Sequence, residues 1–230
     1  MYSKIQKLAA EFIGTFALVF FAAGSICTDQ FLRTTGQGSL GLLGIAIASG
    51  LVIAVMYSAL ARISGGHFNP AITIGFWVTR RSNTFDAVLY WLAQLAGAVT
   101  AAYSLRALIP EETWRAVSLG TPDLARDFTR SYGILLEGLL TFFLVFIFFS
   151  TAVDEPSTSN KNPDLVIGLT VTMAILLGGP LTGAVMNPAR ALGPAIAARH
   201  WANHGVYWVG PLAGGVVAGW LYDALFLKKL

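Results

Sequence analysis

The tripeptide Asn-Pro-Ala occurs twice, at Asn69-Pro70-Ala71 and at Asn187-Pro188-Ala189, and each copy interrupts a long apolar stretch. Because Asn is a favoured N-cap and Pro is favoured at the first helical position, each copy predicts the start of a helix. Such a start carries unpaired N–H groups and the positive end of a helix dipole. At membrane depth that backbone is tolerated only where it is buried in protein or lines a wet cavity. Two copies, one in each half of the chain, therefore predict a pore.

The composition is that of a membrane protein. Of the 230 residues, 55% are hydrophobic and 12% are charged, whereas soluble domains carry roughly 25% charged residues. The net charge is only +3 and the Lys and Arg residues are scattered, so nucleic acid is not an expected partner. One cysteine, Cys27, allows neither an internal disulfide nor a Cys-based metal site. We expect no metal and no cofactor.

The apolar segments predict the fold class. A membrane span takes about 20 apolar residues, and six segments have that length. The short apolar stretches 70–78 and 188–198 that follow the two tripeptides are long enough for about half a bilayer. The sequence therefore predicts an all-α membrane protein with six transmembrane helices and two re-entrant half-helices. The six predicted spans are roughly 8–27, 38–61, 86–109, 132–153, 164–181 and 205–227, residues 110–131 form the longest loop, and 153–163 is a solvated linker.

The two halves of the chain resemble each other. Residues Ala10–Phe16 match Leu136–Phe142, with Glu and Thr in the same positions. Because each half has three spans, the second half must have the opposite orientation in the membrane, and this arrangement brings discontinuous helices together at the midplane. We expect a single channel domain over residues 1–230, with repeat one at about 1–115 and repeat two at about 128–230.

Three motifs carry a family resemblance: Ala10-Glu11-Phe12-Ile13-Gly14-Thr15, Ile63 through Ala71, and Thr182 through Arg190. Through them the chain resembles the aquaporin (major intrinsic protein) family over essentially its whole length. The resemblance implies a passive channel for water, and for small neutral solutes as well, that excludes protons and ions. It also implies a homotetramer in a lipid bilayer with one pore in each subunit.

The polar residues of the two breaks fit that expectation. Each Asn can cap its own half-helix through its side-chain oxygen and leave its NH2 group free to donate into the lumen. A water held there by its oxygen cannot continue a proton wire, and half-helix dipoles and an Arg are known to exclude cations in aquaporin-type pores. Arg190, three residues after Asn187, suits a selectivity constriction. A structural Arg bonded to loop carbonyls is the alternative, and both roles are compatible.

The resemblance assigns three more positions of the selectivity filter, Ser49, Ile175 and Ala184, beside Arg190. Water-only members of the family typically carry Phe and His at the first two positions, and this chain has neither. The filter is therefore expected to be wider and less polar, and to resemble those that pass small neutral solutes. Ordinary helix packing is the alternative reading of Ser49 and Ile175.

Other positions resemble the water-type branch instead. The glycerol-type branch carries Asp directly after the Arg and a basic residue four positions later, where this chain has Ala191 and Ala195. It also has Pro-Leu in the last span, where this chain has Tyr207-Trp208. The scaffold therefore resembles the water-type branch, whereas the filter resembles the wider ones.

The segments before the two half-helices are expected to line the lumen with carbonyl groups. Glu11 and Glu137 lie inside spans, where an acid is a functional candidate. The resemblance implies that both carboxyl groups hold the re-entrant loops through backbone N–H groups, and a proton relay is the alternative. The expected lining residues are Gly65, Gly66, His67, Phe68, Gly183, Val185 and Met186.

Three other classes of protein remain open at this point. A secondary transporter also has inverted repeats, but it would need ion-coupling groups where this chain has neutral Asn. An enzyme is not expected, because His67, His200 and His204 are not spaced with carboxylates to form a catalytic group. A non-conducting junction protein is compatible with the same scaffold, as is a channel mainly for ammonia, urea, glycerol or a metalloid hydroxide. All five Lys residues fall on the side of the N-terminus, which predicts that both termini are cytoplasmic. The expected location is the cell (inner) membrane.

Overall fold

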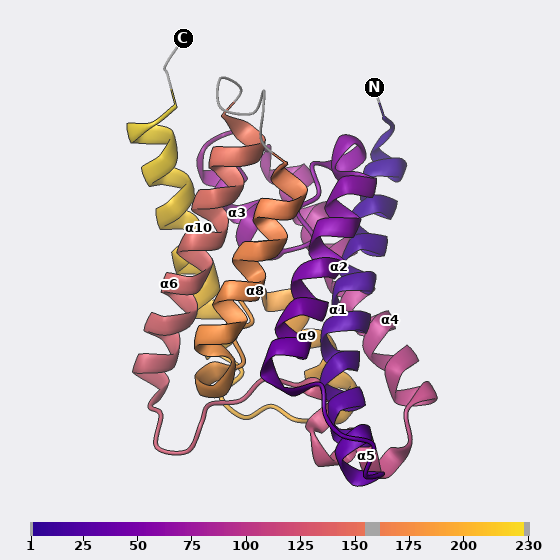
Figure 1. Ribbon diagram of the computed structural model, residues 1–230. Helices are drawn as coiled ribbons and strands as arrows, with labels where there is room; N and C mark the ends of the chain where they lie inside the picture. The colour runs from indigo at the N-terminus through magenta and orange to yellow at the C-terminus, as the bar shows by residue number, and fades with distance from the viewer. Residues whose placement is uncertain (1, 155–161, 228–230) are drawn as a thin grey trace.

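The computed structural model describes residues 2–154 and 162–227, and its long helices stand side by side in one bundle (Figure 1). Two short helices, α3 (Pro70–Val78) and α9 (Pro188–Ala198), match the predicted half-helices residue for residue. Most of the predicted linker 153–163 lies outside the described residues. The long helices are α1 (Lys4–Thr34), α2 (Gly41–Ser64), α4 (Thr84–Leu108), α6 (Arg130–Phe148), α8 (Pro163–Thr182) and α10 (Val206–Leu225).

Five of the described helices, α1, α2, α4, α8 and α6 with its continuation, are long and apolar enough to span a membrane. The sixth, α10, has 20 residues but does not reach that hydropathy, because Gly, Pro, Trp, Tyr and Asp residues take the place of aliphatic ones. It packs along α6 and runs the height of the bundle (Figure 1). The described residues therefore form the predicted all-α arrangement of long helices and two half-helices.

Three local elements differ from the sequence expectation. The predicted loop 110–131 contains a short helix, α5 (Glu111–Ala116), and a 3-10 turn, η1 (Ser118–Gly120). The span that begins with α6 ends in a π-helical turn, η2 (Phe149–Val153). Helix α5 and turn η1 have no apolar run of spanning length, so a search for such segments does not find them, whereas η2 lies inside the predicted span 132–153 and differs only in its helix type.

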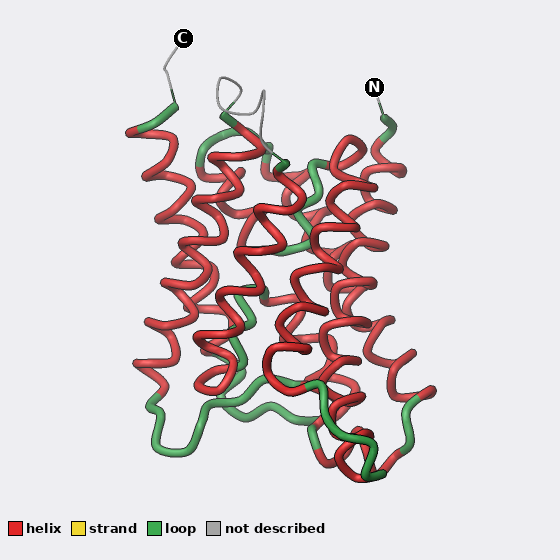
Figure 2. Tube along the Cα trace, viewed as in Figure 1, coloured by secondary structure: helices red, strands yellow, loops and turns green. Residues whose placement is uncertain are grey.

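The breaks in the bundle follow from local cap chemistry. Oδ1 of Asn69 accepts the N–H of Ala71 at 2.8 Å, and Oδ1 of Asn187 accepts that of Ala189 at 3.0 Å. Proline follows each Asn and begins the helix. Figure 2 shows the loops that precede α3 and α9 running into the interior of the bundle from its two ends.

The two spans that precede the half-helices, α2 and α8, end in the same way. Helices α2 and α8 stop at Gly65 (φ 95°) and Gly183 (φ 88°). These left-handed conformations cost glycine little and most other residues more. The chain can therefore turn back into the bundle directly after each of these spans.

The two halves are interlocked. The pair α1–α4 of the first half corresponds to the pair α6–α10 of the second. Helix α3 packs mainly on α10, and α9 packs mainly on α4. Each half-helix is thus packed against the last span of the other half. The end of the bundle where α1 begins is called the N-terminal end below, and the opposite end is called the α5 end.

Small residues let these helices approach closely. A Cβ atom placed on Gly214 of α10 would lie 2.2 Å from the carbonyl oxygen of Gly138 on α6. One placed on Gly97 of α4 would lie 2.4 Å from the carbonyl oxygen of Phe12 on α1. Glycine at these contacts thus serves packing between helices of one bundle.

Gly214→Ala is expected to destabilise the bundle, because the backbone of α6 leaves no room for the methyl group. Overpacking of this kind costs about 1–3 kcal/mol, so the melting temperature in detergent should fall by roughly 2–12 °C. Gly205→Ala is the matched control, since no atom lies within 4 Å of the added Cβ. Equal melting temperatures for the two variants would contradict the packing.

Candidate functional site

The two broken helices meet tip to tip inside the bundle. Nδ2 of Asn69 donates to the carbonyl oxygen of Met186 at 2.8 Å, and Nδ2 of Asn187 donates to that of Phe68 at 2.9 Å. Each amide therefore ties its own half-helix to the loop of the other half. Sequence reasoning expected the whole NH2 group to be free, but one N–H is used in the cross-link. One N–H of each amide remains for the cavity that both residues line.

A buried carboxyl group holds the first re-entrant loop. Glu11 is fully buried in α1. Its Oε1 accepts the N–H of His67 at 3.0 Å and its Oε2 accepts the N–H of Phe68 at 2.7 Å. The Ser64 hydroxyl donates to Oε1 at 2.6 Å, and Nε2 of Gln94 donates to Oε2 at 2.8 Å. Two loop N–H groups that no helix can satisfy are thereby paired.

Glu137 holds the second loop in the same way. This fully buried side chain in α6 accepts the N–H groups of Val185 at 3.0 Å and Met186 at 2.8 Å, and Thr182 donates its hydroxyl at 2.7 Å. Every partner of Glu137 lies 118 positions after a partner of Glu11. This correspondence follows the spacing of the two Asn-Pro-Ala copies. It also gives Ser64 and Thr182, which sequence reasoning missed, equivalent supporting positions.

A central cavity runs past the two Asn residues. Four helices face it with side chains spaced four residues apart, and therefore on one face of each helix. It offers water-sized molecules about 60 Å³ of space, which is room for roughly four to six waters at about 10–15 Å³ each. The helical lining residues are Leu18, Ala22 and Ile26 of α1, Ile45, Ser49, Ile53 and Tyr57 of α2, Leu144 and Phe148 of α6, and Ile167, Val171 and Ile175 of α8.

The four predicted filter residues all line this cavity and are called the filter ring below: Ser49, Ile175, Ala184 and Arg190. Arg190 is 7% exposed, and its Nη1 donates to the carbonyl oxygen of Gly120 at 2.7 Å. The guanidinium group thus has the carbonyl bond of a structural Arg and also borders the lumen. The Ser49 hydroxyl is directed to its own helix, where it donates to Ile45 O at 2.9 Å.

The loop lining differs from expectation at two positions. Gly66, His67, Gly183, Val185 and Met186 border the cavity, but Gly65 and Phe68 do not. Gly65 caps α2 and borders a separate polar cavity at the N-terminal end. The carbonyl group of Phe68 is bonded to Asn187, and its side chain is buried against Gly14.

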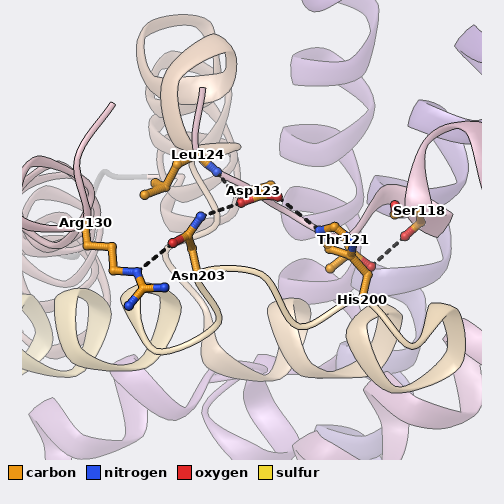
Figure 3. Close-up of polar contacts among 7 residues, drawn as sticks. All are labelled: Ser118, Thr121, Asp123, Leu124, Arg130, His200 and Asn203. Carbon is orange, nitrogen blue, oxygen red and sulfur yellow. Dashed lines mark hydrogen bonds and ion pairs between the residues drawn. The ribbon is translucent and has the colours of Figure 1, made fainter. Parts of the chain in front are cut away.

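A polar network fastens the loop that carries Gly120 to the segment between α9 and α10 (Figure 3). Oδ1 of Asp123 accepts Nδ2 of Asn203 at 2.8 Å, and its Oδ2 lies 3.1 Å from Nε2 of His200. Arg130 donates to Oδ1 of Asn203 at 2.9 Å. Burial raises the pKa of Asp123, but the hydrogen bonds from Asn203, the Leu124 N–H and His200 outweigh burial and hold that pKa below its ordinary value.

Acid is therefore expected to loosen this loop only at low pH. The pKa of Asp123 is lower in the folded protein than its ordinary value of about 3.9. The carboxylate therefore stabilises the folded loop fully above that ordinary pKa, and this stabilisation is lost as the pH falls through the lower pKa of the folded state. Asp123→Ala should loosen the loop at neutral pH as well. Faster amide hydrogen exchange in residues 118–128 of the variant would show this, with Asp127→Asn as the control, because Asn tolerates the left-handed φ of 65° at that position. Equal exchange in the variant and the wild type would contradict the anchoring role.

The other reactive side chains lie apart from one another. His204 accepts Nε1 of Trp208 at 3.0 Å, while Nδ1 of His67 lies 3.0 Å from the Thr73 hydroxyl. Cys27 is buried and does not border the cavity. Within residues 2–154 and 162–227, no three His, Cys, Asp or Glu side chains are placed to hold a metal ion.

A bundle of spans around a narrow lumen, interrupted by two half-helices, defines a membrane channel. The chain belongs to the major intrinsic protein family, whose family model matches residues 1–222. It is 41% identical over 229 residues to "Aquaporin TIP4-4" of Zea mays, covering 98% of this chain and 88% of that protein. It is 39% identical over 234 residues to "Probable aquaporin TIP3-2" of Arabidopsis thaliana, covering 99% and 86%.

The fold has a solved counterpart. The aquaglyceroporin from Plasmodium falciparum matches with a TM-score of 0.85 over 97% of both chains, at 23% sequence identity. At that identity the likeness concerns the fold. The arrangement of spans and half-helices is therefore shared with a channel of known structure.

Proposed function

We propose that this protein is a passive channel for water and small neutral solutes that excludes protons and ions. The observation that carries the proposal is the narrow central cavity lined by Asn69, Asn187 and Arg190. Each Asn offers an N–H to a passing water, and the two helix starts add positive potential at the same depth. A water that accepts from both halves is oriented by its oxygen and cannot relay a proton. The aquaporin names of the plant relatives support the same function.

The assembly and orientation that we propose follow the family. The channel is a homotetramer with one lumen in each subunit, in the cell (inner) membrane. Both termini face the cytoplasm, in line with the Lys residues near the N- and C-termini. The whole chain acts as one domain, and we propose no catalytic step, cofactor or metal.

The filter ring is the basis for including solutes other than water. Ser49 and Ile175 leave more space than a large aromatic ring and an imidazole would, and Ile175 adds an apolar wall. A solute such as urea or glycerol can pair with Arg190 on one side and lie against the apolar wall on the other. Cations approach the positively charged guanidinium group and are repelled.

Filling the filter ring is expected to separate the two kinds of substrate. The double substitution Ser49→Phe with Ile175→His should reduce glycerol and urea flux far more than water flux, because only the larger solutes need the extra width. Stopped-flow light scattering on proteoliposomes with sucrose, glycerol and urea gradients measures all three. A wild type that passes water alone, or a double variant that loses water and solutes equally, would contradict the wide filter.

A further inference from the structure

The inverted repeat relates the filter ring to a second set of residues. The two Asn-Pro-Ala copies are 187 − 69 = 118 positions apart, and the bonds to Glu11 and Glu137 follow the same spacing. Shifting the four residues of the filter ring by 118 gives Ile167, Tyr57, Gly66 and Ile72, in the order Ser49, Ile175, Ala184 and Arg190. All four of these residues border the same cavity. They are called the second ring below.

The second ring lies on the other side of the Asn pair. Along α2, Tyr57 is eight residues nearer the N-terminal end than Ser49, which is roughly 12 Å at about 1.5 Å per residue. His67 borders both the central cavity and the polar cavity at the N-terminal end. The second ring therefore lies where the lumen approaches that mouth, as the filter ring does towards the α5 end.

The chemistry of the two rings is different. The counterpart of Arg190 is Ile72, so the second ring has no cation, and the counterpart of Ile175 is Tyr57. The large aromatic side chain that the filter ring lacks is thus present in the second ring. Phe148, on the facing helix α6, borders the cavity at the same place.

Contacts on several sides hold Tyr57 in position. Its ring packs edge-to-face on Phe148 with 5.5 Å between the centroids, and Phe148 in turn contacts His67 at 6.1 Å and Phe76 at 5.7 Å. A Cβ on Gly66 would lie 2.8 Å from the ring of Tyr57, so the loop backbone leaves it no room to retreat. The side chain is 8% exposed. No hydrogen bond joins its hydroxyl to another residue in the part of the chain that the structure describes.

We propose that Tyr57, supported by Phe148, forms the constriction that sets the largest neutral solute this channel passes, while the filter ring with Arg190 rejects charge. The hydroxyl of Tyr57 is the group that hydrogen-bonds the solute at that point. This inference rests on the proposed channel function. It moves the size limit from the filter ring to the opposite half of the lumen.

The test compares polyols of increasing size in proteoliposomes by stopped-flow light scattering, with water flux measured on the same vesicles. Tyr57→Ala should raise the flux of glycerol and erythritol several-fold relative to water. Tyr57→Phe should keep the wild-type size limit, because the ring remains. Tyr103→Ala, on α4 and away from the cavity, is the matched control and should behave as wild type.

The outcomes separate this inference from the proposed function. If every protein including wild type fails to pass water above empty vesicles, the channel function itself is wrong. If water passes and Tyr57→Ala leaves the ratio of polyol to water flux unchanged, the second ring does not set the size limit. Should the alanine variant lose its thermal transition, Tyr57→Leu keeps apolar packing on Phe148 and decides the question by the same ratio.

Discussion

Arg190→Val is expected to increase proton and cation leakage through the channel by at least about tenfold, since a unit charge at 4 Å contributes about 4 kcal/mol at an effective dielectric constant near 20. The helix dipoles remain in the variant, so the increase should be smaller than that full interaction implies. Water flux should stay near the wild-type level, because the substitution widens the filter ring. A pH-sensitive dye trapped in proteoliposomes measures the leak.

Two further variants separate charge from structure at this position. Arg190→Lys keeps the cation and should keep most of the exclusion, although it loses the planar fork of the guanidinium group. Arg126→Val removes an exposed charge from the loop after η1 and should leave the leak unchanged. If Arg190→Val folds with an unchanged leak, Arg190 serves only to hold the carbonyl group of Gly120.

Glu137→Ala is expected to have the largest effect on stability. The substitution leaves the buried N–H groups of Val185 and Met186 without their partner, at about 1–3 kcal/mol each. The total of roughly 2–6 kcal/mol should lower the melting temperature in detergent by about 4–24 °C. Intrinsic tryptophan fluorescence follows the transition.

The matched control for this variant is Glu112→Ala, which removes an exposed carboxyl group from α5. It should leave the melting temperature unchanged. A Glu137→Ala protein that melts with the control would mean that the second re-entrant loop is held by other contacts. Glu11→Ala is expected to behave like Glu137→Ala, because its carboxyl group pairs the N–H groups of the first loop.

The parts of this structure that sequence reasoning predicted depend on local chemistry. An Asn followed by Pro predicts the start of a helix, and α3 and α9 begin directly after Asn69 and Asn187. The spans follow from length and apolarity, and the repeat follows from matched motifs. Proline and cap residues act within one turn, so their effect can be inferred without knowing what lies across the bundle.

The parts that were missed depend on contacts between distant segments. Tyr57 and Phe148 lie on helices that are apolar on every side, so hydropathy does not indicate which face borders the lumen. The bond from Asn69 to the Met186 carbonyl joins residues 117 positions apart, and Asp123 meets His200 across 77 positions. A shift of 118 applied to the filter residues would have found Tyr57, because the repeat is readable in the sequence.

The most direct test of the account is osmotic shrinkage of proteoliposomes that contain a trapped pH dye. The account predicts water flux well above that of empty vesicles, with a weak temperature dependence, and no proton flux above the empty-vesicle level. Both quantities come from the same vesicles, so incorporation of the protein is controlled. The central claim is that the two half-helix N-termini capped by Asn69 and Asn187 form a lumen that conducts water and excludes protons. Proton flux that rises together with water flux, or the absence of protein-dependent water flux, would contradict it.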